Sequence, residues 1–152
     1  MKKYRNNVGI VVFNRKKQVL LFRRNDAPTD CLDAWQFPQG GMEEGETVAQ
    51  TGLRELKEET SIASAKLVFQ TEESFCYDFP TERYGFAGQR QWWILCFFDG
   101  QDSEINIKTA EPEFSDYKWT DFVDAIDKVW SVKRDIYRKI EKIFSPIIAQ
   151  YK

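Results

Sequence analysis

Between Gly40 and Ile62 the chain reads GGMEEGETVAQTGLRELKEETSI, a glycine-rich turn followed by a stretch rich in acids. The apolar residues from Val48 to Thr60 recur at helical spacing and predict a helix. At about 100° per residue, Glu55, Glu58 and Glu59 fall within an arc of roughly 100°, away from the apolar face. One side of this helix is therefore expected to pack, while another presents three carboxylates.

Carboxylates three or four residues apart repel one another by roughly 0.2–0.5 kcal/mol per pair, so a bound cation would stabilise this cluster. The chain has no histidine, and oxygen ligands alone suit Mg²⁺ or Mn²⁺ better than zinc. Because Mg²⁺ commonly shares its coordination with phosphates and water, the cluster indicates chemistry on a polyphosphate. Taken alone, however, an acidic helix face is more often a solvated surface.

The surrounding pattern decides between these interpretations, and it consists of Gly40, Glu46 and the run Arg54-Glu55-Leu56-x-Glu58-Glu59-x-x-Ile62. In residue types and spacing it resembles the Nudix box, which is far more specific than a short glycine motif. The resemblance implies that Glu55, Glu58 and Glu59 are metal ligands. It also implies that Glu46 and Arg54 pair and hold the loop against the helix.

Two backbone positions of the box also matter. By the resemblance, Gly40 lets the turn approach the helix closely. The family has glycine at the helix exit, where a left-handed conformation is usual, but this chain has Ser61. Serine in that conformation costs about 1 kcal/mol, which affects the local loop and no expected metal ligand.

Four further segments resemble the RNA 5′ pyrophosphohydrolase and dinucleoside polyphosphate hydrolase branch of the family. They are Tyr4-Arg5-x-Asn7-Val8-Gly9, Trp35-Gln36-Phe37-Pro38-Gln39-Gly40-Gly41, Gly88-Gln89-x-Gln91-x-Trp93 and Val132-Lys133-Arg134-Asp135-x-Tyr137. Each alone is an ordinary strand, turn or helix sequence. Their common order and compatible spacing favour this branch.

The predicted substrate-binding residues are Arg5, Arg24, Gln39, Trp130, Val132 and Lys133. The resemblance places Arg5 near the terminal phosphates, and Arg24 and Lys133 near the first nucleotides, where arginine can bind phosphate or stack on a base. In some relatives an aromatic residue sandwiches a base where this chain has Val132. Stacking by Trp130, two residues earlier, is therefore a hypothesis beside the packing role usual for tryptophan at a helix end.

Glu113 matches an acidic residue that this branch places in a mobile loop reaching the metals; the alternative is an ordinary exposed loop acid. The expected metal ligands are thus Glu55, Glu58, Glu59 and Glu113, and the expected catalytic residues are Glu58, Glu59, Glu113 and Arg54. Two or more Mg²⁺ (or Mn²⁺) ions would bind the polyphosphate and activate a water, without a covalent intermediate. Glu58, Glu59 and Glu113 are equal candidates for the general base.

The resemblance implies a metal-dependent RNA 5′ pyrophosphohydrolase, which converts 5′-triphosphorylated or diphosphorylated RNA to 5′-monophosphate and promotes mRNA decay. A hydrolase of dinucleoside polyphosphates such as diadenosine tetraphosphate is the alternative, because the same carboxylates and arginines would accept a free nucleotide. A catalytically silent nucleotide-binding Nudix domain is disfavoured because every acid of the box is present.

The amino-acid composition excludes several other classes of function. The absence of histidine excludes Ser-His and Cys-His catalysis, and Cys31, Cys76 and Cys96 lack the spacing of a zinc site or a disulfide framework. A net charge of −2 and a pI near 5.3 argue against long nucleic-acid contacts, so the RNA contact should be short and no DNA binding is expected. No apolar run is long enough for a signal or membrane segment, which predicts a cytoplasmic protein without membrane contact.

The 152 residues suit one domain, residues 1–152. Strands are predicted at Asn7–Phe13, Gln18–Phe22, Leu67–Glu72, Ser74–Asp78, Gln91–Phe98 and Tyr117–Trp119. Thr120 is expected to cap a helix that ends near Val129. A last helix carries a stripe of Val132, Ile136, Ile140, Ile143 and Ile147, with Pro146 expected to kink or end it. These elements predict an α/β (α+β) fold with a mixed β-sheet between α-helices, the Nudix fold.

Overall fold

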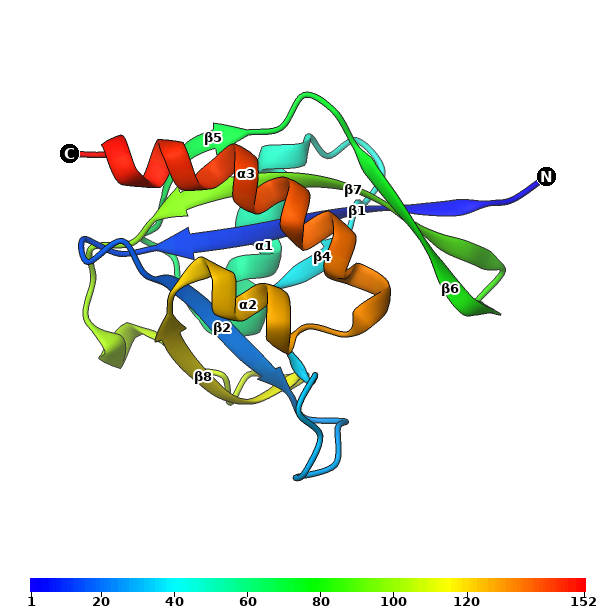
Figure 1. The fold of residues 1–152 in the computed structure, drawn as a ribbon, viewed down its shortest axis with the longest axis horizontal. Helices are drawn as coiled ribbons and strands as arrows, with labels where there is room; N and C mark the ends of the chain where they lie inside the picture. Colours follow the sequence, from blue (N-terminus) through cyan, green and yellow to red (C-terminus); the bar gives the residue numbers. More distant parts are fainter.

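The computed structural model describes residues 1–152 and contains one eight-stranded sheet with three α-helices (Figure 1). The strands are β1 (Tyr4–Phe13), β2 (Val19–Arg24), β3 (Trp35–Gln36), β4 (Gln39–Gly41), β5 (Lys66–Gln70), β6 (Phe75–Arg83), β7 (Phe86–Phe97) and β8 (Phe114–Thr120). The helices are α1 (Val48–Thr60), α2 (Phe122–Lys128) and α3 (Arg134–Gln150), and short 3₁₀ turns span Asp102–Glu104 and Ser131–Lys133.

The sheet is mixed, as predicted. Its main path runs β3-β2-β1-β7-β5, while β4 pairs with β1, β6 with β7, and β8 with β2. Only β1 and β7 are parallel, and they pair along the whole of β1, from Tyr4 beside Gly88 to Phe13 beside Phe97. The carboxyl-terminal parts of both strands are buried, which agrees with their long apolar runs.

Helices cover both faces of the sheet, so the predicted arrangement of a mixed sheet between helices is confirmed. In Figure 1, α2 and α3 lie in front of the sheet and α1 lies behind it. Alternate residues of β1 supply two separate cores. Val11 and Phe13 pack on the side of α2 and α3, whereas Ile10 and Val12 pack with Leu56 of α1.

One prediction about the C-terminal helices is wrong, namely that Thr120 caps α2. Thr120 is the last residue of β8, and Asp121 is the N-cap of α2; the Thr120 hydroxyl instead bonds to the carboxylate of Asp124, at 2.7 Å. Pro146 does not end α3, which continues to Gln150. Phe144 and Ile148, on either side of the proline, are both buried in the core, and this packing stabilises the final turns.

Two short strands were not predicted. β3 and β4 lie in a stretch rich in polar residues, glycine and proline, and they form only because β2 and β1 lie alongside them. Strand β6 also extends five residues beyond the predicted end at Asp78, to Arg83. The three cysteines are free, as predicted. None of the three α-helices combines the length and the apolar character that a transmembrane helix requires.

Candidate active site

Helix α1, which carries the acidic cluster, has a defined start and end. At its start, the Gln50 amide donates to the Thr47 hydroxyl at 3.1 Å, and the Gln50 side chain accepts from the Thr47 amide at 2.9 Å, a capping box. At its end, Ser61 adopts the left-handed conformation (φ 69°) expected for the family's glycine. The Ser61 hydroxyl donates to the carbonyl of Asn106 at 2.8 Å, a bond that offsets the conformational cost.

The guanidinium of Arg54 ties the preceding loop to α1. It donates to both carboxylate oxygens of Glu46, at 2.7 and 2.9 Å, so the expected ion pair is present in bidentate form. This contact is the main reason why the pKa of Glu46 falls to about 2. Arg54 also lies 2.8 Å from Glu55 and 3.2 Å from Glu58, and therefore holds two acids of the box on one side of the helix.

Strand β4 needs glycine at its middle position, Gly40. A Cβ atom at this position would overlap the carboxyl group of Glu55. The backbone of β4 thus passes directly against a carboxylate of α1.

The acids of α1 and the loop before β8 line one hollow of about 550 Å³, formed by Glu55, Glu58, Glu59, Ala110, Glu111 and Glu113. Glu59 is buried, only 5% exposed, whereas Glu58 and Glu113 are open to solvent. The Glu113 segment is tied to the end of β2, since the Asn25 amide donates to the Glu113 carbonyl at 2.8 Å. The predicted loop acid therefore faces the acids of the helix.

Glu59 is in an unfavourable environment for an anion. Burial, followed by the charges of Glu113 and Glu55, raises the pKa of Glu59 to about 10, and burial also raises the pKa of Glu55. The Oε2 atom of Glu59 is buried without a hydrogen-bond partner. A buried oxygen of this kind normally has a partner, and a cation in the hollow would supply one.

The donor set fits a hard divalent cation, because it contains only carboxylate oxygens. In the present arrangement of side chains, no three acids are positioned to bind one ion. Arg54 draws Glu55 and Glu58 toward itself. Coordination would therefore require these two side chains to turn from Arg54 toward Glu59, which α1 already places beside them.

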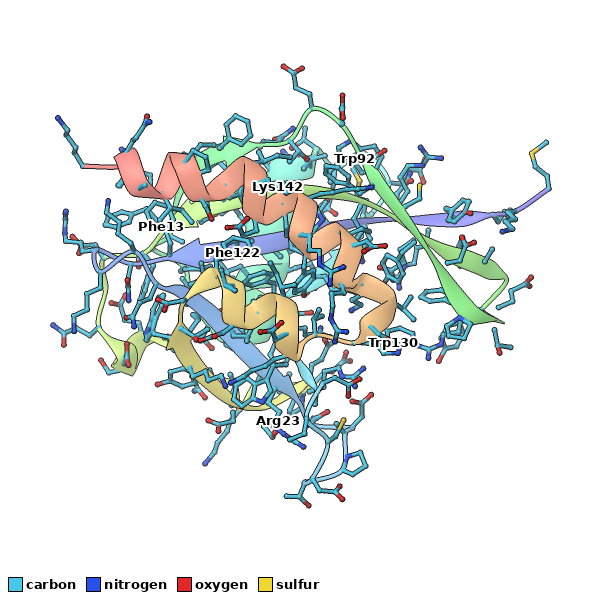
Figure 2. The ribbon with its side chains drawn as sticks, in the orientation of Figure 1. Phe13, Arg23, Trp92, Phe122, Trp130 and Lys142 are labelled. Atoms are coloured by element: carbon cyan, nitrogen blue, oxygen red, sulfur yellow. The ribbon has the colours of Figure 1, made fainter.

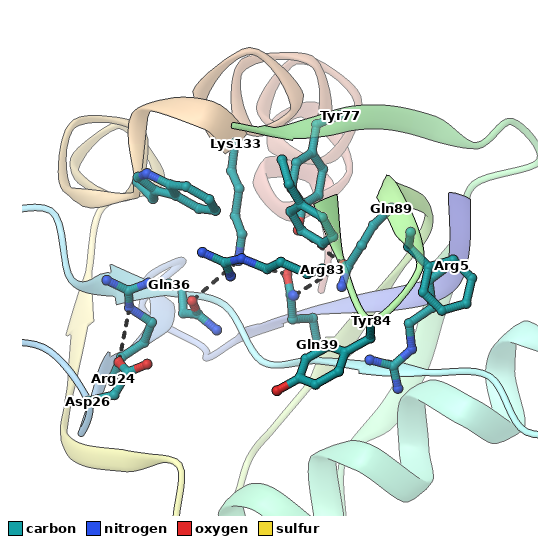
Figure 3. Close-up of a pocket in the computed structure, with 13 residues that line it drawn as sticks. Arg5, Arg24, Asp26, Gln36, Gln39, Tyr77, Arg83, Tyr84, Gln89 and Lys133 are labelled. Atoms are coloured by element: carbon teal, nitrogen blue, oxygen red, sulfur yellow. Dashed lines mark hydrogen bonds and ion pairs between the residues drawn. The ribbon is translucent and has the colours of Figure 1, made fainter. Parts of the chain in front are cut away.

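A second cavity, of about 440 Å³, lies next to the acidic hollow (Figure 3). Five of the predicted substrate-binding residues line it, namely Arg5, Arg24, Gln39, Trp130 and Lys133. Val132 does not line it and instead packs against the core of α2 and α3. The lining residues that sequence reasoning did not assign to a site are Asp26, Gln36, Tyr77, Phe79, Arg83, Tyr84, Phe86 and Gln89. Gln36 and Gln89 lie within the quoted segments, but no sequence signal indicated the residues of the β6–β7 hairpin.

Lys133 is the most buried cation of this cavity, at 4% exposed. Its ammonium group donates to the side-chain oxygens of Gln36 and Gln39, at 3.3 and 3.1 Å, and forms no ion pair. Burial, together with the charges of Arg24 and Arg83, lowers the pKa of Lys133 to about 7. The ammonium also lies over the ring of Tyr77, 6.0 Å from its centre. A buried cation whose partners are all uncharged is suited to receive an anionic ligand.

A third hollow joins the other two. It shares Arg5, Gln36, Gln39 and Gln89 with the cationic cavity, and Glu55, Glu59 and Glu113 with the acidic one. The Gln91 side chain holds this junction in place, since its amide donates to Asn7 at 2.8 Å and to Gln39 at 3.0 Å. The result is a continuous groove that leads from cations and aromatic rings to a cluster of carboxylates.

Comparison with known proteins agrees with this geometry. Residues 3–140 match the family model of the NUDIX domain, so the chain belongs to the Nudix family, whose hydrolases act on phosphoanhydride bonds and generally depend on divalent metal. It is 37% identical over 150 residues to the RNA pyrophosphohydrolase of Pelagibacter ubique, covering 95% of this chain and 93% of that protein. It is 40% identical over 159 residues to the RNA pyrophosphohydrolase of Bartonella bacilliformis, with 95% and 94% covered.

The fold is also found among solved structures. The Escherichia coli dihydroneopterin triphosphate pyrophosphohydrolase superposes with a TM-score of 0.69 at 25% identity, over 91% of this chain and 97% of that one. The Nudix fold and the hydrolase class expected from the sequence are therefore confirmed.

Proposed function

We propose that this protein is a metal-dependent RNA 5′ pyrophosphohydrolase. It converts 5′-triphosphorylated or diphosphorylated RNA to 5′-monophosphate, releases pyrophosphate or phosphate, and so promotes mRNA decay in the cytoplasm. The observation that carries this proposal is the continuous groove between the cationic cavity and the carboxylates of α1. The two relatives named RNA pyrophosphohydrolase, which match almost the whole chain, support the choice of RNA as substrate.

In this proposal, the first nucleotides of the RNA occupy the cationic cavity, where Lys133 and Arg24 neutralise phosphate and Trp130 offers a ring for stacking. The terminal phosphates extend past Arg5 and Gln39 toward α1. Both residues line the junction between the cavity and the acidic hollow. The groove thus orients the scissile anhydride toward the carboxylates.

Glu55, Glu58, Glu59 and Glu113 would hold the metal, and the unpartnered oxygen of Glu59 supports this assignment. We infer two or more Mg²⁺ or Mn²⁺ ions, which when bound supply charge neutralisation for the polyphosphate and activation of a water. The general base is one of Glu58, Glu59 and Glu113. Arg54 does not line the cationic cavity, and its ion pairs with Glu55 and Glu58 support a role in positioning these two acids.

The test is a parallel incubation of short RNAs with 5′-triphosphate, 5′-diphosphate and 5′-hydroxyl ends, with Mg²⁺ or with chelator. We expect metal-dependent conversion of the first two to 5′-monophosphate RNA and no change in the third. Glu58→Gln should abolish most of the turnover, because it removes one negative charge from the acidic hollow. Wild-type protein that leaves all three RNAs unchanged in Mg²⁺ would refute the proposal.

A dinucleoside polyphosphate is the second candidate substrate. The acidic protein, with a net charge of −2, and the limited volume of the cavity favour a small ligand over a long one. Diadenosine tetraphosphate therefore belongs in the same experiment. Turnover of this compound alone would transfer the function to the hydrolysis of small nucleotides.

A further inference from the structure

The hairpin of β6 and β7 contributes residues to the cationic cavity that have no role in the proposed function so far. It closes through Tyr84 and Gly85, which both have positive φ (51° and 82°), as tight hairpin turns require. The turn sets Arg83 opposite Phe86 in the ladder. The register of the ladder shifts between Asp78 and Arg83, and Arg83 itself pairs next to the turn and lines the cavity.

The guanidinium of Arg83 lies over two aromatic rings. Its central carbon is 5.2 Å from the ring centre of Phe79 and 5.4 Å from that of Trp130. Phe79 belongs to β6, and Trp130 lies in the connection between α2 and α3 (Figure 2). The N–H donors of the guanidinium stay available, because Arg83 makes cation–π contacts here and no side-chain hydrogen bond. Arg83 also forms no ion pair with any carboxylate.

Arg83 lines the part of the cavity that is not shared with the junction toward the carboxylates of α1. The residues shared with the junction are Arg5, Gln36, Gln39 and Gln89, whereas Arg83, Phe79 and Trp130 line only the cationic cavity. In Figure 3 the Arg83 side chain reaches into the cavity toward Lys133. A substrate whose terminal phosphates point to α1 would therefore leave the cavity on the side of Arg83.

We propose that Arg83 is a further substrate-binding residue, which binds an internucleotide phosphate of the RNA while Phe79 and Trp130 hold its guanidinium in place. A planar fork of N–H donors matches the geometry of a phosphodiester. The contact gives the groove a preference for RNA, because a dinucleoside polyphosphate has no internucleotide phosphate. This inference rests on the proposed function.

The experiment compares Arg83→Ala with wild-type protein on a triphosphorylated RNA of several nucleotides, at a series of salt concentrations. We expect KM to rise roughly ten-fold, the effect of losing one charge-assisted hydrogen bond, with kcat within about two-fold of wild type. The dependence of log KM on log salt should become shallower by about 0.7, the value for one phosphate contact with a single strand. A purely structural role for Arg83 would leave this slope unchanged.

Arg15→Ala is the matched control. Arg15 lies over the ring of Phe97 at 5.2 Å, and its removal changes the net charge by the same amount; unlike Arg83, it also pairs with Asp99 at 2.9 Å. It lies in the turn between β1 and β2 (Figure 1), whereas the cavity is lined by Arg5 near the start of β1. We expect Arg15→Ala to leave KM and its salt dependence unchanged.

The outcomes separate this inference from the proposed function. If wild-type protein hydrolyses RNA ends and Arg83→Ala keeps the wild-type KM and salt slope, Arg83 does not bind substrate. An equal rise in KM for diadenosine tetraphosphate would also overturn the inference, because that substrate lacks the internucleotide phosphate. If wild-type protein does not act on RNA, the proposed function itself fails. If Arg83→Ala does not fold, Arg83→Lys replaces it in the experiment. This variant keeps the positive charge but loses the planar fork of donors. It should raise KM for RNA by less than the roughly ten-fold expected for Arg83→Ala, and it should leave KM for diadenosine tetraphosphate unchanged.

Discussion

Replacing Lys133 tests whether the cationic cavity favours ligand binding at the expense of the stability of the folded protein. Lys133 is 4% exposed and bonds only to the amide oxygens of Gln36 and Gln39. Burying a cation without a counter-ion costs free energy. We therefore expect Lys133→Met to stabilise the protein in the absence of ligand and to weaken its binding of triphosphorylated RNA.

The magnitude follows from the pKa of Lys133, which falls from 10.5 to about 7 on folding. Between these two values the unfolded chain binds more protons than the folded protein, so this residue's contribution to stability rises with pH. Below pH 7 its penalty is fully present, and above 10.5 it is lost. Each pH unit in this window changes the free energy of unfolding by about 1.36 kcal/mol. The free energy of unfolding of Lys133→Met should exceed that of wild type at pH 7, and this difference should be smaller by about 2 kcal/mol at pH 9.

The assay is urea unfolding of both proteins at pH 7 and pH 9, with RNA affinity measured separately by fluorescence anisotropy. Lys139→Met, which replaces an exposed lysine of α3 by methionine as well, is the control for the loss of a lysine from the protein. Two results would refute the reasoning. One is that Lys133→Met is less stable than wild type at pH 7, and the other is that the difference in free energy of unfolding between the two proteins is the same at pH 7 and pH 9.

Three further changes have defined expectations. Glu59→Gln should lower Mg²⁺-dependent turnover of triphosphorylated RNA at least about 100-fold; wild-type turnover would contradict this. Stability without metal should be equal or higher, because burial raises the pKa of Glu59 and folding near pH 7 must protonate a carboxyl that is ionised in the unfolded chain. Ser61→Ala should lower the free energy of unfolding by about 1 kcal/mol, since it loses the bond to Asn106 and keeps φ at 69°. Ser61→Gly should be nearly neutral in the same urea titration, because relief of strain offsets that loss. Tyr137→Phe removes the buried hydroxyl that accepts from the Phe37 amide at 2.9 Å, and should lower the free energy of unfolding by about 1–3 kcal/mol. A loss below about 0.5 kcal/mol in thermal unfolding, roughly the size of a surface substitution, would contradict this expectation.

The sequence by itself determined helix α1 and the order of its functional groups. The bounds Val48–Thr60 were predicted and are those of the structure. The reason is physical: the period of a helix is set by local geometry, so the spacing of Glu55, Glu58 and Glu59 decides that they share a side. The pairing of Glu46 with Arg54 was implied by the resemblance to the Nudix box, and it is present in the structure.

Only the tertiary structure decided which distant segments meet around the cationic cavity. Lys133 is a charged residue in a polar stretch, and nothing local indicates that α3 and the sheet bury it. Trp130 and Val132 are two positions apart, yet the 3₁₀ turn at Ser131–Lys133 directs the first into the cavity and the second into the core. Such differences depend on how the turn docks, which side-chain periodicity does not specify.

The hairpin of β6 and β7 shows most clearly that local sequence does not determine which segments meet at the cavity. The strand pattern predicted that β6 begins near Ser74, but it did not predict that the strand continues to Arg83 and carries that residue to Trp130. Strand length here is set by pairing with β7, a partner that only the folded sheet supplies. Three of the four acids proposed to bind metal thus lie within one helix. The cavity proposed to bind substrate, in contrast, exists only once five separate parts of the chain have packed together: β1, the end of β2, the β3–β4 segment, the β6–β7 hairpin and the turn before α3.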